Sequence, residues 1–408
     1  MSYSGFKRLI PLFLIIFIDS LGYFLVLPVL LHIYMPGPDS VLATTDSITY
    51  RNVLFGITMS LSSLAMILYS PIMGHISDTL GRKKTMFYCL LAAIFGFLLP
   101  VIGIKYKIIS LILLGRFITG ASSASQPIAQ AAITDFSTGK VKAFYLSMIA
   151  FAMTLAMMLG PLGGNYLSDP TLFHGFNVNT PYYAAAGLAL LNLILMMTLF
   201  KDKDQKIAHL EQFSLKEKFV ILKEELTKNK VAILLAIFFL LELAWSSYYQ
   251  SIFMIMKEHF HYSGERISLF LTYIGVWMCI GLTVLYRIIL KLTSLKATLM
   301  ISLVGTVFGM LGCSITSTAI LQWIFVVPTA IFVGTTYTSL LTVISHETSK
   351  EHQGWALGVA STLLGLAWLL TGFASGFLVS ILSTLPLYLS SLAITIAFLL
   401  LCSKLRHR

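Results

Sequence analysis

The stretch GHISDTLGRKK, residues 74–84, separates two apolar runs at 53–73 and 85–104. Each run has the roughly 20 mostly apolar residues that a helix needs to cross a lipid bilayer. The stretch between them holds two glycines, which permit a tight turn, and three consecutive cations at positions 82–84. Short loops rich in Lys and Arg stay on the cytoplasmic side of a membrane. The stretch therefore predicts two membrane-spanning helices joined by a cytoplasmic turn.

Apolar runs with short basic loops between them continue along the whole chain of 408 residues. Hydrophobic residues make up 57% of the chain and charged residues only 11%, whereas about a quarter of a soluble domain is charged. Lipid must therefore contact most of the surface. The net charge of +11 does not indicate nucleic-acid binding, because the cations never form one basic face. A soluble enzyme, a soluble receptor domain and a nucleic-acid-binding protein are excluded.

Twelve apolar runs are long enough to span a bilayer. The longest polar interruption, residues 201–230, carries charges throughout and leaves six runs on either side. We therefore predict an all-α membrane protein with an N-terminal six-helix bundle at 1–200, a cytoplasmic central loop at 201–230 and a C-terminal six-helix bundle at 231–408. The predicted transmembrane helices are 9–32, 53–73, 85–104, 107–133, 143–167, 181–200, 231–256, 265–290, 297–317, 320–344, 354–377 and 383–402.

The distribution of Lys and Arg predicts the orientation of these helices. The loops and termini on one side hold 22 of the 28 cations and those on the other side hold 5, while Arg116 lies inside a run. Because cations stay on the cytoplasmic side, both termini and the central loop are expected in the cytoplasm. An even number of helices also places the two termini on one side. We expect a multi-pass protein of the cytoplasmic, or inner, membrane.

Three ionisable residues, Asp19, Arg116 and Glu242, lie near the middle of predicted helices. At 1.5 Å per residue each lies roughly 14–17 Å deep, close to the midplane of a ~30 Å hydrocarbon core. A charge at this depth costs about 2.5 kcal/mol or more, so such residues usually face a partner or a wet cavity. They are therefore candidates for a substrate or proton pathway. The alternative is a structural ion pair that seals the bundle.

Polar and aromatic side chains follow two of these residues along their helices. Gln126 lies beyond the arginine, and Tyr248, Tyr249 and Gln250 lie beyond the glutamate. A lipid-facing helix has no need of such side chains, whereas a binding site uses aromatic faces and a few hydrogen-bonding groups. These four residues are candidates for the same pathway. The alternative is close packing between helices, which small and polar residues also favour.

The sequence predicts no metal site and no cofactor. The four cysteines lie in or beside apolar runs and form no CxxC pair. The chain has no P-loop motif, so ATP is not expected to be the direct energy source. The few clusters of His with an acid lie at helix ends, where solvated side chains are the usual case. A membrane enzyme is therefore not expected.

The stretch 74–84 resembles the signature G-x-x-x-D-x-x-G-R-K of the major facilitator superfamily, with Gly74, Asp78, Gly81 and Arg82 at the matching places. Further matches follow in order along the chain. They are Gly115-Arg116-Phe-Ile-Thr-Gly120, which is similar to the R-x-x-x-G element, Gly160-Pro161-Leu-Gly163-Gly164, which resembles the G-P-x-x-G-G antiporter motif, and the segment 353–358 before the eleventh helix. The last two are similar to the drug:proton antiporter branch, which includes the tetracycline exporters.

This resemblance implies two pseudo-symmetric six-helix bundles around a central cavity lined chiefly by helices 1, 4, 7 and 10. It assigns the loop motif to gating and places Asp78 near the cytoplasmic end of helix 11. It also implies that the glycines and Pro161 of helix 5 contact helices of the other bundle and close the periplasmic end. This chain lacks the acids that tetracycline exporters carry within helices 3 and 9, which argues against tetracycline itself as the substrate.

The expected function is secondary active transport of a small organic molecule by alternating access, coupled to protons and directed outward. Asp19, Glu242 or both would carry the proton. The expected partners are a small-molecule substrate, protons and the lipid bilayer, and the expected state is a monomer. The first alternative is a proton-coupled importer of a nutrient or metabolite on the same fold. A membrane sensor that no longer transports is a further alternative.

Overall fold

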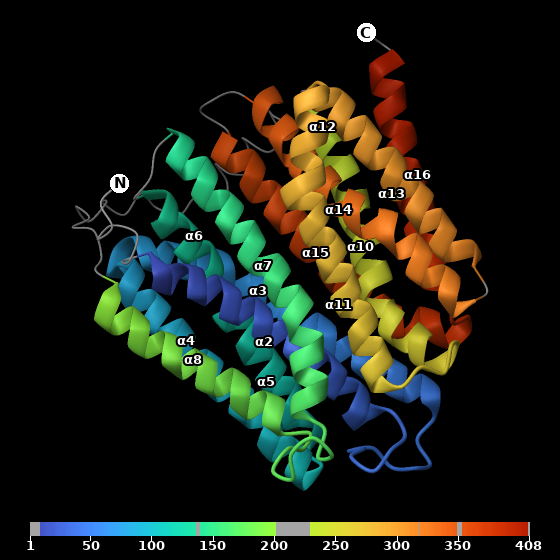
Figure 1. Ribbon diagram of the computed structural model, residues 1–408. Helices are drawn as coiled ribbons and strands as arrows, with labels where there is room; N and C mark the ends of the chain where they lie inside the picture. Colours follow the sequence, from blue (N-terminus) through green and yellow to red (C-terminus); the bar gives the residue numbers. More distant parts are fainter. Residues whose placement is uncertain (1–8, 136–138, 201–228, 317, 349–352, 407–408) are drawn as a thin grey trace. The chain divides into compact units, whose positions relative to one another are not determined.

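The computed structural model describes residues 9–135, 139–200, 229–316, 318–348 and 353–406 (Figure 1). Residues 201–228, which form most of the predicted central loop, lie outside these ranges. Every regular element within the ranges is a helix.

The first half of the chain supplies the first six predicted spans. Its helices are α2 (Ile10–Tyr34), α3 (Ile48–Leu80), α4 (Arg82–Tyr106), α5 (Ile109–Ser122), α6 (Ser125–Asp135), α7 (Gly139–Leu167) and α8 (Thr180–Leu199). The helices of the second half are α10 (Asn229–Glu258), α11 (Gly264–Ile280), η1 (Gly281–Leu285), α12 (Tyr286–Leu292), α13 (Leu295–Ile315), α14 (Ala319–Glu347), α15 (Gln353–Ile381) and α16 (Leu385–Arg406).

The length and composition of these helices suit a membrane. In the described part of the chain, ten helical stretches are long and apolar enough to cross a bilayer, with α11, η1 and α12 counted as one. The pair α5 and α6, together with α7, accounts for the two remaining predicted spans. The prediction of an all-α membrane protein with twelve transmembrane helices is confirmed.

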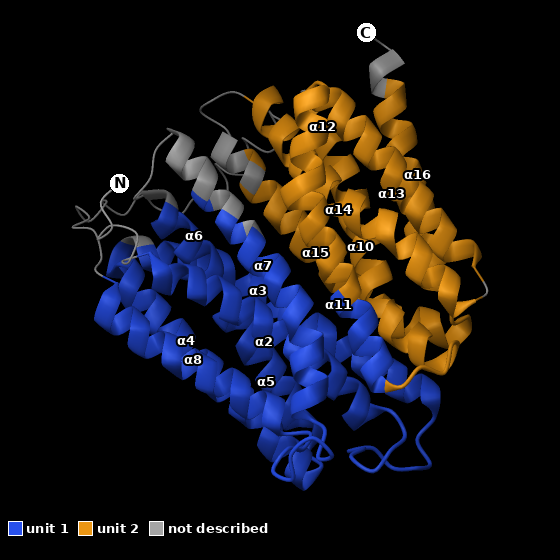
Figure 2. Cartoon of the chain, in the orientation of Figure 1, with its two compact units in different colours: residues 1–213, 264–272 blue, residues 214–263, 273–408 orange. Residues whose placement is uncertain are grey.

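The chain divides into two compact units, which Figure 2 colours separately. Unit 1 comprises residues 1–213 and 264–272, and unit 2 comprises residues 214–263 and 273–408. The beginning of α11 therefore belongs to unit 1, although the sequence predicts a boundary only at the central loop.

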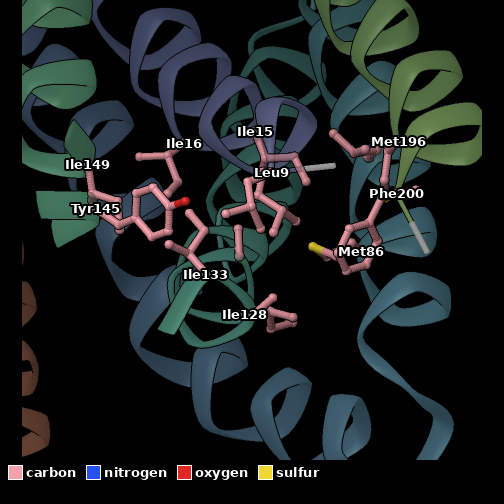
Figure 3. Packing of buried hydrophobic residues seen from close by; sticks show 14 of the residues in the cluster. Leu9, Ile15, Ile16, Met86, Ile128, Ile133, Tyr145, Ile149, Met196 and Phe200 are labelled. Carbon is pink, nitrogen blue, oxygen red and sulfur yellow. The ribbon is translucent and has the colours of Figure 1, made fainter. Parts of the chain in front are cut away.

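An apolar cluster fixes the position of α2 within unit 1 (Figure 3). Ile15 and Ile16 of α2 are fully buried, and they belong to one cluster with Met86 of α4 and Tyr145 of α7. Close van der Waals packing of this kind holds helices together where lipid replaces water. The two isoleucines precede Asp19 by four and three residues and therefore share its side of the helix. The packed turn of α2 thus holds Asp19 in place.

The fourth predicted span is not one continuous helix. α5 ends at Ser122 and α6 begins at Ser125, with two residues between them. Pro127 explains the break, because its nitrogen cannot donate to the carbonyl of Ser123 and its ring crowds that carbonyl. The backbone N–H of Gln126 donates to the Ser123 carbonyl oxygen instead, at 3.0 Å. The prediction of an unbroken helix at 107–133 is wrong at this point.

The helix of the eighth predicted span widens near its middle. The segment η1 forms π-helical turns between α11 and α12. Its first residue, Gly281, packs against the backbone of α14: a Cβ at this position would lie 2.6 Å from the carbonyl oxygen of Ile331 and 2.8 Å from its Cα. Only glycine leaves room for this approach.

The loop between α2 and α3 is organised around Arg51, whose side chain is almost completely buried. Its guanidinium donates hydrogen bonds to the carbonyl oxygens of Tyr34 (2.6 Å), Ala43 and Asp46 (3.2 Å) and to the hydroxyl oxygen of Ser40 (3.0 Å). Burial of a cation is tolerated when its N–H groups are hydrogen-bonded in this way. One side chain therefore ties together several separate parts of the loop.

Candidate functional site

Unit 1 contains a cavity of about 60 Å³ between α2, α3, α4 and α5. Asp19 and Arg116, two of the three midplane residues selected from the sequence, both line it. Hydroxyl groups surround these two side chains, and they belong to Ser62, Ser63, Thr119, Ser122 and Ser123. The cavity is therefore polar in a part of the chain where a helix facing lipid would be apolar.

Asp19 is buried in α2 and has a hydrogen-bond partner from the broken fourth span. The hydroxyl of Ser125 donates to Oδ2 of Asp19. Ser125 is the first residue of α6, so the break before α6 sets the position of this donor. The next residue, Gln126, donates from Nε2 to the hydroxyl oxygen of Ser20 at 3.4 Å. Both contacts join the start of α6 to the middle of α2.

Arg116 is only 3% exposed, and its guanidinium has few partners. The guanidinium carbon lies 5.0 Å from the centroid of the Tyr23 ring, and one terminal nitrogen lies 3.9 Å from the sulfur of Met59. The Nε atom of Arg116 has no hydrogen-bond partner. Within the described residues no ion pair joins Arg116 to Asp19. The alternative interpretation, a structural pair between these two residues, is not the arrangement that the structure has.

Glu242, the third midplane residue, lies buried in α10 of unit 2. The indole nitrogen of Trp368 in α15 donates to Oε2 of Glu242 at 3.4 Å. Trp245 and Tyr249 follow Glu242 by three and seven residues and lie on the same side of α10. The Tyr249 ring lies 5.6 Å from the Trp245 ring and 6.1 Å from the Trp368 ring, measured between centroids. The indole that contacts the carboxylate therefore belongs to a cluster of aromatic side chains.

The two other α10 candidates, Tyr248 and Gln250, contact neighbouring helices. The Tyr248 ring stacks on Trp245 with centroids 6.0 Å apart, and the thiol of Cys313 lies 3.9 Å from its hydroxyl oxygen. Nε2 of Gln250 donates to the carbonyl oxygen of Trp368 at 3.0 Å and to the hydroxyl oxygen of Thr371 at 2.9 Å. These contacts join α10 to α13 and α15. Packing between helices is the alternative role that the sequence allows for these residues.

Three residues that contact the midplane charges are not among the sequence candidates: Tyr23, Met59 and Trp368. Tyr23 follows Asp19 by four residues, so helical spacing could have placed both on one side of α2. Trp368 lies inside an apolar run, where an indole N–H needs an acceptor. Ser125 belongs to the polar run beyond Arg116 in the sequence, but its contact with Asp19 depends on the break in the helix.

The structure describes part of the loop motif at residues 74–84. α3 ends at Leu80 and α4 begins at Arg82, and Gly81 between them has a φ of 93°, a conformation that favours glycine. Gly74 has open space around it, and the side chain of Asp78 lies outside the described residues. The gating role of the motif therefore stays a prediction.

Lys83, the residue after Arg82, contacts the end of α8. Its ammonium group donates to the carbonyl oxygens of Met197 at 2.8 Å and Phe200 at 2.6 Å. The last carbonyl groups of a helix have no partner within the helix. The cation of the loop motif therefore caps α8 within unit 1.

The glycines of the helix 5 motif pack against α2 of the same unit. A Cβ at Gly160 would collide with the Cβ of Phe24, and a Cβ at Gly164 would collide with the carbonyl oxygen of Leu25. A Cβ at Gly163 would lie an ordinary 3.8 Å from the Leu25 side chain. Pro161, the remaining residue of the motif, is buried inside α7. Within unit 1, Gly160 and Gly164 therefore contact α2, and the contact with the other bundle that the resemblance implies stays a prediction.

Among the residues that the structure describes, no three or more His, Cys, Asp or Glu side chains lie together in a group that could hold a metal ion.

Comparison with known proteins agrees with this arrangement. A family model described as Major Facilitator Superfamily matches residues 12–372. Among curated relatives, the class C tetracycline resistance protein of Escherichia coli is 26% identical over 266 residues, which cover 64% of this chain and 61% of the relative. The class E protein of Escherichia coli is 21% identical over 371 residues, which cover 90% of this chain and 86% of the relative.

A solved structure, that of the human organic anion transporter MFSD10 (TETRAN), is similar in fold. It superposes with a TM-score of 0.74 over 98% of this chain and all of the other, at 17% identity. At this identity the likeness concerns the fold alone. The match to the class C protein spans less than two thirds of that relative's length.

Proposed function

Because the chain belongs to the Major Facilitator Superfamily, we propose that it is a proton-coupled secondary transporter that exports a small organic molecule. Members of this family are membrane transporters and not enzymes. Transport would proceed by alternating access, with the two bundles rocking about a site near the middle of the membrane. We place the protein in the cytoplasmic membrane as a monomer, with the N-terminus, the C-terminus and the central loop in the cytoplasm.

The observation that carries the proposal is the position of Asp19 in the polar cavity of unit 1. A carboxylate buried away from water has to be paired with a cation or has to bind a proton. The hydroxyl of Ser125 gives Asp19 a hydrogen bond but no positive charge. Asp19 is therefore suited to bind a proton when the cavity is closed and to release it when water enters.

Glu242 is a second proton carrier in the proposal, because it is buried in unit 2 with one hydrogen bond from Trp368. Arg116, Gln126, Tyr248, Tyr249 and Gln250 complete the proposed pathway for substrate and protons. Arg116 lines the same cavity as Asp19, and Gln126 contacts the neighbouring Ser20. The three other residues lie in α10 together with Glu242.

Export is favoured by two lines of support. The helix 5 segment at 160–164 resembles an antiporter motif, and curated relatives are named tetracycline resistance proteins. Exchange requires that a proton and the substrate exclude each other during the cycle. Tetracycline is not the proposed substrate, because the acids of helices 3 and 9 are absent from this chain.

Import together with protons is the second candidate function, and one observation favours it. Asp19 and Arg116 line one cavity without forming an ion pair. Such a cavity has room for a proton on the carboxylate and for a negatively charged group beside the guanidinium at the same time. Solute and proton would then cross the membrane together.

The test is transport in inside-out vesicles that contain a trapped pH-sensitive dye. Vesicles with an acidic interior are given a panel of small organic molecules one at a time. We expect that at least one compound releases protons from vesicles with the wild-type protein, and that Asp19→Asn abolishes this release at equal protein level. Asp39→Asn is the matched control, since it makes the same change at an exposed loop position.

The direction follows from the sign of the dye signal. Export by exchange predicts uptake of the compound into the acidic vesicles with loss of protons. Uptake that acidifies the interior would replace export by import with protons, and an unchanged signal for Asp19→Asn would remove this residue from the proton pathway.

A further inference from the structure

Arg116 is a buried cation whose charge is not balanced in its surroundings. It is 3% exposed, its contacts are the Tyr23 ring and the Met59 sulfur, and its Nε atom has no hydrogen-bond partner. An aromatic face and a thioether offer a guanidinium far less than the carboxylate or carbonyl oxygens that buried cations usually contact. Arg51 of the same unit shows how a buried guanidinium is usually accommodated, because four oxygen atoms accept hydrogen bonds from it.

Asp19 does not supply the missing negative partner. Its carboxylate accepts a hydrogen bond from Ser125, and no ion pair between it and Arg116 exists in the described part of unit 1. Both side chains nevertheless line the same cavity. An anion that enters the cavity would therefore meet a cation whose Nε–H has no hydrogen-bond partner, beside a carboxyl group that is tied to a neighbouring helix.

The hydroxyl groups in the cavity lining already have acceptors. Ser62 and Thr119 donate to the carbonyl oxygen of Arg116, and Ser122 and Ser123 donate to the carbonyl oxygen of Thr119. The N–H groups of Arg116 are therefore the donors that the cavity offers to a ligand. The volume of about 60 Å³ is enough for a carboxylate group with a water molecule. The cavity therefore has room for a carboxylate headgroup beside Arg116.

We propose that Arg116 binds the carboxylate of a small organic acid in this cavity, so that the transported substrate is an organic anion. A planar carboxylate accepts two parallel N–H bonds from one guanidinium, which pairs the Nε atom that is now without a partner. The proposal deepens the transporter function given above and rests on it. It concerns only the binding step, so it can be tested without measuring transport.

The experiment uses formate as the probe, because formate is a carboxylate without a side chain. The full-length protein in detergent is heated with sodium formate, with formamide as a neutral molecule of the same shape, and with sodium chloride at equal ionic strength. The variants are Arg116→Gln and Arg116→Lys, and Arg287→Gln is the matched control at an exposed position of α12. The difference between the variants removes general salt effects from the comparison.

We expect formate to raise the melting temperature of the wild type and of Arg287→Gln by roughly 2 °C or more near saturation. Arg116→Gln should lose this shift, and Arg116→Lys should keep part of it. Equal shifts in all variants would mean an adventitious ion only and would overturn the proposal. An equal effect of chloride and formate on the wild type would assign the cavity to an inorganic anion instead.

A second measurement decides the matter if Arg116→Gln does not fold. Binding of ¹⁴C-formate to the wild-type protein is measured by equilibrium dialysis, with benzoate, succinate and citrate as competitors and benzamide as the neutral control. Displacement by at least one organic acid and not by benzamide supports a substrate headgroup. Absence of formate binding, or binding that none of the acids displaces, would overturn the proposal. If formate binds but the vesicles show no transport, the transporter function fails and the anion site remains.

Discussion

The side chain of Lys83 reaches from the start of α4 to the end of α8, where its ammonium group contacts the carbonyl oxygen of Phe200 at 2.6 Å. The carbonyl of Met197 accepts from the same nitrogen at 2.8 Å. A cation at this end of a helix also interacts favourably with the helix dipole. Lys83 therefore joins two helices of unit 1 through residues that lie more than a hundred positions apart in the chain.

Lys83→Met should lower the stability of unit 1, because the methionine keeps the apolar stem and loses the cap. We expect a cost of about 1–2 kcal/mol for the lost charged hydrogen bonds. Lys84→Met is the control, since Lys84 is exposed. Thermal unfolding of both variants in detergent is the measurement, and equal melting temperatures would mean that the cap contributes nothing.

Gly164→Ala should be destabilising although it adds only one methyl group. The new Cβ would collide with the carbonyl oxygen of Leu25, so α7 and α2 would have to separate. Overpacking of this kind costs about 1–3 kcal/mol. Gly163→Ala is the matched control, because its Cβ would lie 3.8 Å from the Leu25 side chain. Folded yield and melting temperature compare the two variants, and a Gly164→Ala protein as stable as Gly163→Ala would contradict the close contact.

Glu242→Gln should leave the protein folded and remove its coupling to protons. A glutamine side chain can still accept the hydrogen bond from Trp368, but it cannot bind and release a proton. We expect normal expression with loss of accumulation driven by a pH gradient. Glu265→Gln, at an exposed position in the first turn of α11, is the control. Unchanged accumulation in Glu242→Gln would leave Asp19 as the proton carrier of the proposal.

Arg51→Gln should loosen the loop between α2 and α3. Glutamine is shorter and cannot reach the oxygens of Tyr34, Ala43 and Asp46 together. Loss of these charged hydrogen bonds should cost about 2 kcal/mol or more. Limited proteolysis of the purified protein is the measurement, with faster cleavage expected within residues 35–47. Lys107→Gln is the control at an exposed position, and identical cleavage of both variants would contradict the role of Arg51.

The sequence predicts the number of spans well because the length and hydropathy of each span follow from the bilayer alone. The midplane residues Asp19 and Arg116 could also be found, since a charge is rare at that depth. The side chains that contact these two residues could not be predicted, because these contacts depend on the tertiary arrangement. Ser125 reaches Asp19 only because α6 starts again after the break.

The break in the fourth predicted span and the neighbour of the helix 5 glycines both depend on tertiary packing. Pro127 was visible in the sequence, but a proline bends one transmembrane helix and breaks another, according to how its neighbours satisfy the freed backbone groups. A run of glycines predicts a close approach between helices but does not name the neighbour. In the structure, the neighbour of Gly164 is Leu25 of α2.

The π-helical segment Gly281–Leu285 has a consequence for comparing this chain with its relatives. A π-turn holds one residue more than an α-turn, so each one rotates the following helix by about 100° relative to an uninterrupted helix. Positions in α12 therefore correspond to those of an unwidened relative only after a one-residue gap is introduced. Removing one residue from 281–285 would restore a regular helix and leave the faces of α11 and α12 in their present relation. An ungapped alignment of this region pairs residues that lie on different sides of the helix.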